Sequence, residues 1–142
     1  MLSSAAVIAY FAMALPACAA DPIGVWFTED NDARVRIYNC GQDLCGTVLS
    51  LKEPNDSETG KPKLDKFNQD ASKRGRPIVG IELMSGLKPN GTADQWEGSL
   101  YNPEDGNMYK GILTAQDLLT LKLQGCVLGG LICKSEIWKR TN

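Results

Sequence analysis

The residues that could carry chemistry are limited, because the 142-residue chain contains no histidine. Serine or cysteine nucleophiles activated by an imidazole are therefore excluded, as are histidine-rich metal sites. The adjacent acids Glu104 and Asp105 could act as an acid and base pair, but their turn-forming context favours solvated carboxylates. The segment Lys52–Asp56, with Asp65 and Asp70, matches no EF-hand calcium loop. We expect no catalytic residue, no metal and no cofactor, and hence a protein that is not an enzyme.

Arg74 and Arg76 are the strongest candidates for ligand contacts. They flank a glycine and precede Pro77, so both guanidinium groups start from a constrained backbone. One interpretation is a fork that binds a carboxylate or phosphate. The other, which we favour, is that each arginine pins a long loop by bonding its carbonyl groups or acids such as Asp65 and Asp70.

Three aromatic residues, Trp96, Tyr101 and Tyr109, could line a ligand cavity, with Glu82 as its polar group. Alternation places Trp96 and Tyr101 on opposite faces of one strand and does not identify the face that points inward. Aromatic residues on barrel strands more often fill the core. Ligand contact and core packing both remain open for these residues.

Residues 1–20 carry no charge and combine an apolar run with the small residues Ala17–Ala20. This pattern is typical of a signal peptide, here cleaved near Ala20, and the run is too short to span a bilayer. A rival interpretation is lipid attachment at Cys18, although Pro16 fits a lipobox poorly. We expect an exported, periplasmic protein whose mature chain, 21–142, forms a single domain.

The mature chain retains four of the five cysteines, and an even number in an exported chain predicts disulfides. A two-residue turn at Gln42–Asp43 would place Cys40 opposite Cys45, at a separation that suits a disulfide. A turn at Gly129–Gly130 would place Cys126 opposite Cys133 in the same way. A zinc site is disfavoured because the spacing lacks the close cysteine pairs of a zinc ribbon.

Short alternating segments bounded by turns predict eight strands. They cover residues 24–28, 33–39, 44–51, 78–83, 95–101, 107–114, 119–124 and 131–140. Short turns between most of these strands predict an all-β, eight-stranded antiparallel up-and-down barrel, in which closure leaves no free edge. One long polar loop, about 52–77, interrupts the series, and we expect one or two helical turns within 65–73.

The net charge is −2 and the pI about 5.1, with both signs interspersed. This pattern indicates no nucleic-acid partner and no basic membrane patch. We expect a monomer that does not insert into a membrane.

Several motifs, in this order, resemble the bacterial family of exported proteins of unknown function called DUF2147. The resemblance implies a lipocalin-like, calycin-type barrel in the periplasm of a Gram-negative bacterium. In lipocalins a Gly-x-Trp motif on the first strand packs against an arginine on the last, which implies that Arg140 covers Trp26 at the barrel floor. The motifs are Gly24–Trp26, Cys40–Gly46, Leu51–Asp56, Arg74–Pro77 with Gly80, Trp96–Gly98, Tyr101–Gly106 with Tyr109, and Gly125–Leu131.

The residues and the resemblance together suggest a binding module that holds a small apolar or anionic molecule, with the long loop as its lid. The alternative is a protein-interaction or envelope-stress component whose barrel is solid and which works through its surface. A barrel interior filled by side chains would argue against the first hypothesis.

Overall fold

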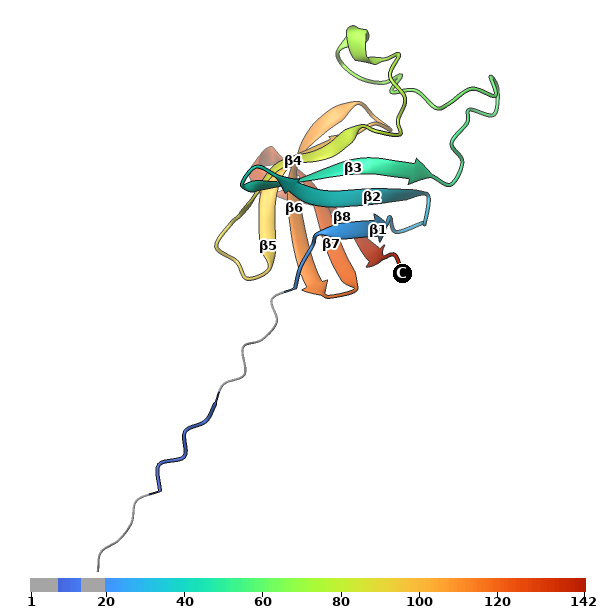
Figure 1. The fold of residues 1–142 in the computed structure, drawn as a ribbon. Helices are drawn as coiled ribbons and strands as arrows, with labels where there is room; N and C mark the ends of the chain where they lie inside the picture. The colour runs from blue at the N-terminus through green and yellow to red at the C-terminus, as the bar shows by residue number, and fades with distance from the viewer. Residues whose placement is uncertain (1–7, 14–19) are drawn as a thin grey trace, which may run out of the picture.

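The computed structural model describes residues 8–13 and 20–142, and its eight strands form one closed barrel (Figure 1). Successive strands pair antiparallel, and β1 pairs with β8 to complete the circle. The predicted up-and-down barrel is therefore confirmed. Within the described part of the chain, no helix is long and apolar enough to cross a membrane. The strands are β1 (Gly24–Phe27), β2 (Ala33–Cys40), β3 (Asp43–Leu51), β4 (Glu82–Pro89), β5 (Gln95–Asn102), β6 (Asn107–Asp117), β7 (Thr120–Val127) and β8 (Ile132–Arg140).

Most of the predicted signal peptide, including Cys18, lies outside the described residues. The structure therefore tests neither cleavage near Ala20 nor lipid attachment.

The inward face of the barrel is filled by large apolar side chains. Strand alternation sends every second residue inward, and inward residues of seven strands, all but β5, meet in one buried cluster. Trp96 and Leu100 pack against this cluster from β5. The barrel axis is thus a packed core, whose members are Trp26, Val35, Ile37, Leu44, Met84, Leu87, Leu113, Ala115, Leu121, Leu123 and Trp138.

The fourth strand differs from its prediction, which placed it at residues 78–83. Gly80 adopts a φ of 99°, which ends the extended chain before the strand begins. The strand β4 instead runs Glu82–Pro89, and an irregularity between Ser85 and Lys88 shifts its register against β5. Apolar alternation does not reveal this bulge, so the predicted strand ended at residue 83 and left out most of β4.

Both predicted disulfides are present, Cys40–Cys45 and Cys126–Cys133. Cys126 lies directly opposite Cys133, as expected. The predicted register around Cys40 is wrong, because Cys40 lies opposite Asp43. The positive φ of 70° at Gly41 places the turn one residue earlier than predicted. The disulfide therefore runs diagonally, from the pair Cys40–Asp43 to the pair Tyr38–Cys45.

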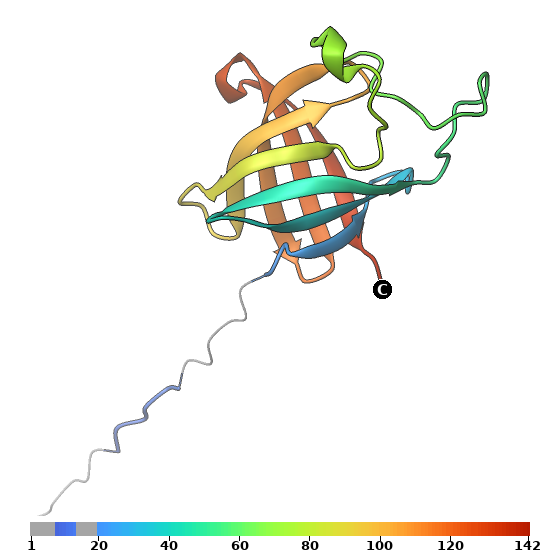
Figure 2. The same cartoon turned by 45° about the horizontal axis from the view of Figure 1, so that its top comes forward.

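The two ends of the barrel differ (Figure 2). The chain enters β1 at one end, which we call the floor, and there the connections between strands are short. The other end, which we call the loop end, carries the long connection from β3 to β4, the β5–β6 turn and the β7–β8 hairpin. Among the described residues, helical structure is limited to single 3-10 turns at this end, η1 (Ala71–Lys73) within the long loop and η2 (Leu128–Gly130) in the hairpin. The helix predicted within 65–73 is thus reduced to η1.

Candidate functional site

The long loop is held together by its own backbone. Two isolated bridges join Asn55 to Pro62 and Leu64 to Pro77. Hydrogen bonds from the Asp65 amide to the Arg76 carbonyl, at 2.9 Å, and from the Ile78 amide to the Lys63 carbonyl, also at 2.9 Å, close the base of the loop. The loop therefore presents its side chains from a defined position.

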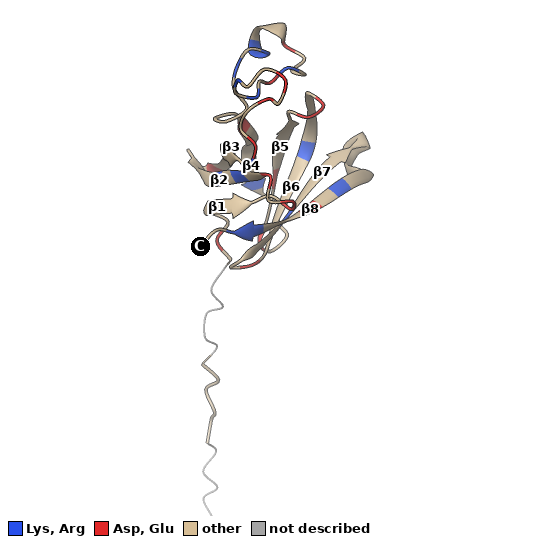
Figure 3. Ribbon diagram, turned by 90° about the vertical axis from the view of Figure 1, so that its right-hand side faces the viewer, with Lys and Arg blue, Asp and Glu red and all other residues tan. Residues whose placement is uncertain are grey.

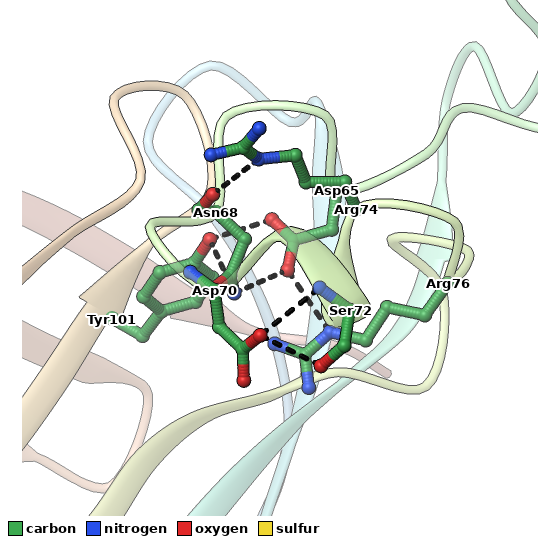
Figure 4. A network of polar contacts seen from close by, with 7 residues as sticks. All are labelled: Asp65, Asn68, Asp70, Ser72, Arg74, Arg76 and Tyr101. Carbon is green, nitrogen blue, oxygen red and sulfur yellow. Dashed lines mark hydrogen bonds and ion pairs between the residues drawn. The ribbon is translucent and has the colours of Figure 1, made fainter.

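A buried carboxylate fastens this loop to the barrel wall (Figure 4). Asp65 is fully buried and accepts a hydrogen bond from the Tyr101 hydroxyl at 2.6 Å, one from Asn68 Nδ2 at 2.8 Å and one from Arg76 Nε at 2.9 Å. Arg74 Nε donates to the Asn68 carbonyl at 2.7 Å. Both arginines thus bond groups of the loop itself, which is the interpretation that we favoured from the sequence.

Local sequence explains how the loop presents these groups. Asp70 begins η1 by accepting a hydrogen bond from the Ser72 amide at 3.0 Å. The Asn68 side chain accepts a hydrogen bond from the Asp70 amide at 2.8 Å, so its other amide atom is left facing Asp65. The short helix thereby turns the chain so that Arg74 and Arg76 point back toward Asp65 and Asn68.

Close approach of two backbones completes the anchor. Gly106, in the β5–β6 turn, has a φ of 74°, and a β-carbon there would collide with the carbonyl of Phe67. Only glycine meets both conditions without strain. The turn and the loop therefore pack against each other because position 106 has no side chain.

The electrostatics of the anchor favour an ionised Asp65. Burial acts to raise the pKa of this carboxyl, but hydrogen bonds from Tyr101, Asn68 and Arg76 outweigh it and hold the pKa below its usual value. Burial, together with the bond to Asp65, raises the pKa of Tyr101 to about 12. The pair therefore remains carboxylate and phenol at neutral pH, and neither group is poised to exchange a proton.

The anchor lies on the outside of the barrel. Leu100 packs against the core, so its neighbour Tyr101 points outward, and Tyr101 is buried because the loop covers it. Asp65 has no exposed surface from which to contact a substrate. What this arrangement can do chemically is hold the loop in place.

The other candidate ligand contacts do not gather around one cavity. Trp96 packs against the core from the inside, and Tyr109 pairs with Leu100 near the loop end. The Tyr109 hydroxyl donates to Asp105, so this acid bonds the β5–β6 turn to the start of β6. Glu82 is exposed and accepts a hydrogen bond from the Tyr38 hydroxyl at 3.5 Å.

Asn68 is the one residue of the anchor that sequence reasoning missed. Asp65 was named as an acid that the arginines could bond and in an acidic pattern that matches no calcium loop, but not as the centre of an anchor. The signal that could have marked it is an acid between two apolar residues, Leu64 and Phe67, in an otherwise polar loop.

The floor of the barrel is closed by Trp26 and Arg140. The guanidinium carbon of Arg140 lies 4.2 Å from the centroid of the Trp26 ring, and its nitrogens donate to the carbonyls of Ile23 at 2.8 Å and Leu118 at 2.7 Å. A β-carbon at Gly24 would collide with this guanidinium. The glycine of the Gly-x-Trp motif therefore leaves room for the arginine.

Two hollows lie on the outer surface. One, of about 400 Å³, is lined by Arg36, Tyr38, Thr47 and Leu49 of β2 and β3. The other, of about 270 Å³, lies near the turn that joins β1 and β2. Within the described residues, no group of three or more acidic or cysteine side chains is placed to hold a metal ion.

The fold and these contacts define a lipocalin-like barrel with a packed axis and an externally anchored loop. A family model described as an uncharacterized protein conserved in bacteria, DUF2147, matches residues 24–140, and the chain belongs to this family. No curated protein matches the chain.

One similar solved structure is protein HP1028 from the human pathogen Helicobacter pylori, which is described as belonging to the lipocalin family. The TM-score is 0.71, with 23% sequence identity over 87% of this chain and 85% of that chain. At this identity the likeness shows the fold alone.

Proposed function

We propose that this protein is a non-enzymatic binding barrel of the bacterial periplasm that recognises another protein through its loop end. The proposal departs from a ligand held on the barrel axis, because that axis is occupied by the side chains of the core. The family and the two disulfides support a location outside the cytoplasm.

The observation that carries the proposal is an apolar surface at the loop end. Monomeric soluble proteins seldom expose many large apolar side chains together, and such patches favour protein contacts. The β7–β8 hairpin contributes most of them, with Leu131 85% exposed. We call this set the apolar rim; its members are Phe67, Met108, Leu128, Leu131 and Ile132.

The elements that bear the rim are neighbours. Lys110 of β6 pairs with Cys126 of β7, so Met108 lies next to the hairpin. The chain at Phe67 packs against the β5–β6 turn at Gly106. The loop anchor therefore positions one end of the rim, and the Cys126–Cys133 disulfide braces the other.

The test is site-specific photo-crosslinking in cells that express the full chain. A photoreactive side chain at Leu131 is expected to capture one defined periplasmic protein, whereas the same group at Leu118, which is 56% exposed at the floor, captures none. Leu118 is a matched control because it is also an exposed leucine in a turn between strands. Equal labelling patterns at the two positions would contradict the proposal.

A second candidate function is binding of a small anion in the outer hollow of about 400 Å³. Arg36 lines this hollow beside two hydroxyl groups and makes no ion pair with a described residue. A guanidinium in that setting suits a carboxylate or phosphate. Native mass spectrometry of the protein from the periplasm would show an added mass that the Arg36→Ala variant lacks.

A further inference from the structure

The seam that closes the barrel is short. Strand β8 has nine residues, Ile132–Arg140, whereas β1 has four, Gly24–Phe27. Only Trp26 and Phe27 of β1 pair with β8, opposite Arg140 and Lys139. Along Ile132–Ile137, no strand in the described part of the chain covers the side of β8 that faces away from β7.

Two hydrogen bonds show which backbone groups point to that side. The Arg140 amide donates to Leu119, in the turn before β7, at 3.0 Å. The Ile137 amide points the other way and donates to the side chain of Glu29 at 3.2 Å. Because backbone direction alternates along a strand, Cys133 and Ser135 direct their amides and carbonyls the same way as Ile137.

This edge is accessible. Residues 132–135 are all exposed. Figure 3 shows β8 at the margin of the fan of strands β5–β8, with β1 reaching only its C-terminal part. The Cys126–Cys133 disulfide joins β8 to β7 on the opposite side, so it leaves the edge open.

We infer that two copies of this chain pair their β8 strands antiparallel, about a two-fold axis at Ser135. An isologous contact requires a surface that complements itself. Pairing centred on Ser135 places Lys134 of each copy opposite Glu136 of the other, which gives two cross-strand pairs of opposite charge. Ser135 bonds its counterpart through both backbone groups, and Cys133 lies opposite Ile137 of the second copy.

The order of charges favours a second copy over an unrelated strand. Lys134 and Glu136 are separated by one residue, so antiparallel pairing about that residue matches opposite charges twice. In the single chain the Glu29 side chain accepts the hydrogen bond of the Ile137 amide. On pairing, a backbone carbonyl of the second copy takes the place of this side chain. The net charge of −2 imposes little repulsion between copies.

This inference rests on the proposed function, a barrel that works through its surface, and it names a second copy as one partner, in place of the monomer expected from sequence. A dimer brings two apolar rims into one assembly, because each rim includes Ile132 at the start of β8. The captured periplasmic protein and the second copy therefore use adjacent surfaces.

The charge test uses protein purified from the periplasm of cells that express the full chain. Sedimentation velocity over a concentration series is expected to show a reversible dimer. Lys134→Glu should weaken dimerisation at least tenfold, since it opposes two pairs of like charges. The double variant Lys134→Glu with Glu136→Lys restores opposite charges and should recover most of the loss, although Glu136 also accepts a hydrogen bond from the Trp138 indole at 2.9 Å.

The position of the axis is tested by oxidation. Ser135→Cys is expected to form a disulfide-linked dimer, because residue 135 faces its counterpart across the axis. Ser99→Cys, also exposed but on β5 with strands on both sides, should stay monomeric under the same conditions. Circular dichroism would check that each variant remains folded.

A chain that stays monomeric at all concentrations would overturn the inference. So would a dimer that is insensitive to Lys134→Glu. In either case, capture of a protein at Leu131 but not at Leu118 would leave the proposed function standing.

Discussion

Replacing Tyr101 with phenylalanine removes the hydroxyl that joins the barrel wall to the loop and leaves the aromatic ring in place. The hydroxyl donates to the buried Asp65 carboxylate at 2.6 Å. A hydrogen bond to a charged partner contributes about 1.5–3 kcal/mol, so a loss of about 2 kcal/mol is expected. Asn68 and Arg76 still bond the carboxylate, which keeps the cost below that of an isolated buried charge.

The loss should appear first as local opening of the loop, because the anchor lies outside the core. About 2 kcal/mol corresponds to a roughly 30-fold increase in the population of the open loop. Hydrogen exchange measured by NMR at the amides of Asp65 and Ile78, which close the base of the loop, should accelerate by about that factor. Exchange at the buried Leu113 amide should change less, since β6 belongs to the barrel.

Tyr38→Phe is the matched control. Its hydroxyl also bonds a carboxylate, that of Glu82, but at 3.5 Å and on the exposed face of β2. Exposed pairs of this kind contribute little. If Tyr101→Phe and Tyr38→Phe leave the loop amides equally protected, the bond to Asp65 does not hold the loop and the reasoning is refuted.

Three further predictions concern the loop anchor and the floor of the barrel. Gly106→Ala should release the loop and increase its proteolysis, whereas Gly60→Ala, also at positive φ but with open space around it, should not. Arg140→Lys should lower the free energy of unfolding by about 2–3 kcal/mol, because it loses the planar stacking and the carbonyl bonds; Arg34→Lys, on an exposed arginine, should cost far less in denaturant titrations. The Asp65 anchor, whose carboxyl pKa is lowered in the fold, stabilises the loop above about pH 4 and is lost as pH falls through that pKa. Loop exchange, corrected for intrinsic rates, should therefore rise in acid, and an Asp65→Asn variant should show no such rise.

The alkaline limit has the opposite sign and a separate cause. Because burial and Asp65 raise the pKa of Tyr101 from 10.0 to about 12, the anchor favours the neutral phenol. The stabilisation that Tyr101 gives the loop through this raised pKa is complete below pH 10 and disappears as pH rises toward 12. Because the hydrogen bond to Asp105 also raises the pKa of Tyr109, more than one tyrosine should titrate late. In ultraviolet titration of phenolate absorbance, Tyr101→Phe should remove the component near pH 12 and leave the others.

Local information was enough to predict the barrel and both disulfides. Alternation marks strands with one buried face, and short turns force neighbours in sequence to be neighbours in space. The same information failed at β4, where Leu87 is buried beyond the positive φ of Gly86. A bulge breaks alternation without leaving a distinct sequence signal.

The anchor was less predictable because it joins positions far apart in the chain. Alternation placed Tyr101 on the face opposite Trp96. Which of the two faces points inward depends on the residues that form the core of the whole barrel, and these come from all parts of the chain. Tyr101 was therefore grouped with residues that line a cavity, whereas the loop covers it from outside. The pairing of Arg76 with Asp65 was among the alternatives because both lie in one loop, but Asn68 carried no pattern that singled it out.

The position of the anchor also bears on how the loop can act. To act as a lid over the open end of the barrel, the loop would have to swing away from the outer face of β5. This motion breaks the hydrogen bond from Tyr101 to Asp65 and leaves the carboxylate without one of its donors. The packed axis offers no compensating ligand contact on the inside. Closing the loop over the barrel therefore costs interactions without gaining any, whereas keeping it on the outer wall holds Phe67 beside the β5–β6 turn. The anchor thus favours a fixed outer surface as the functional part of this barrel.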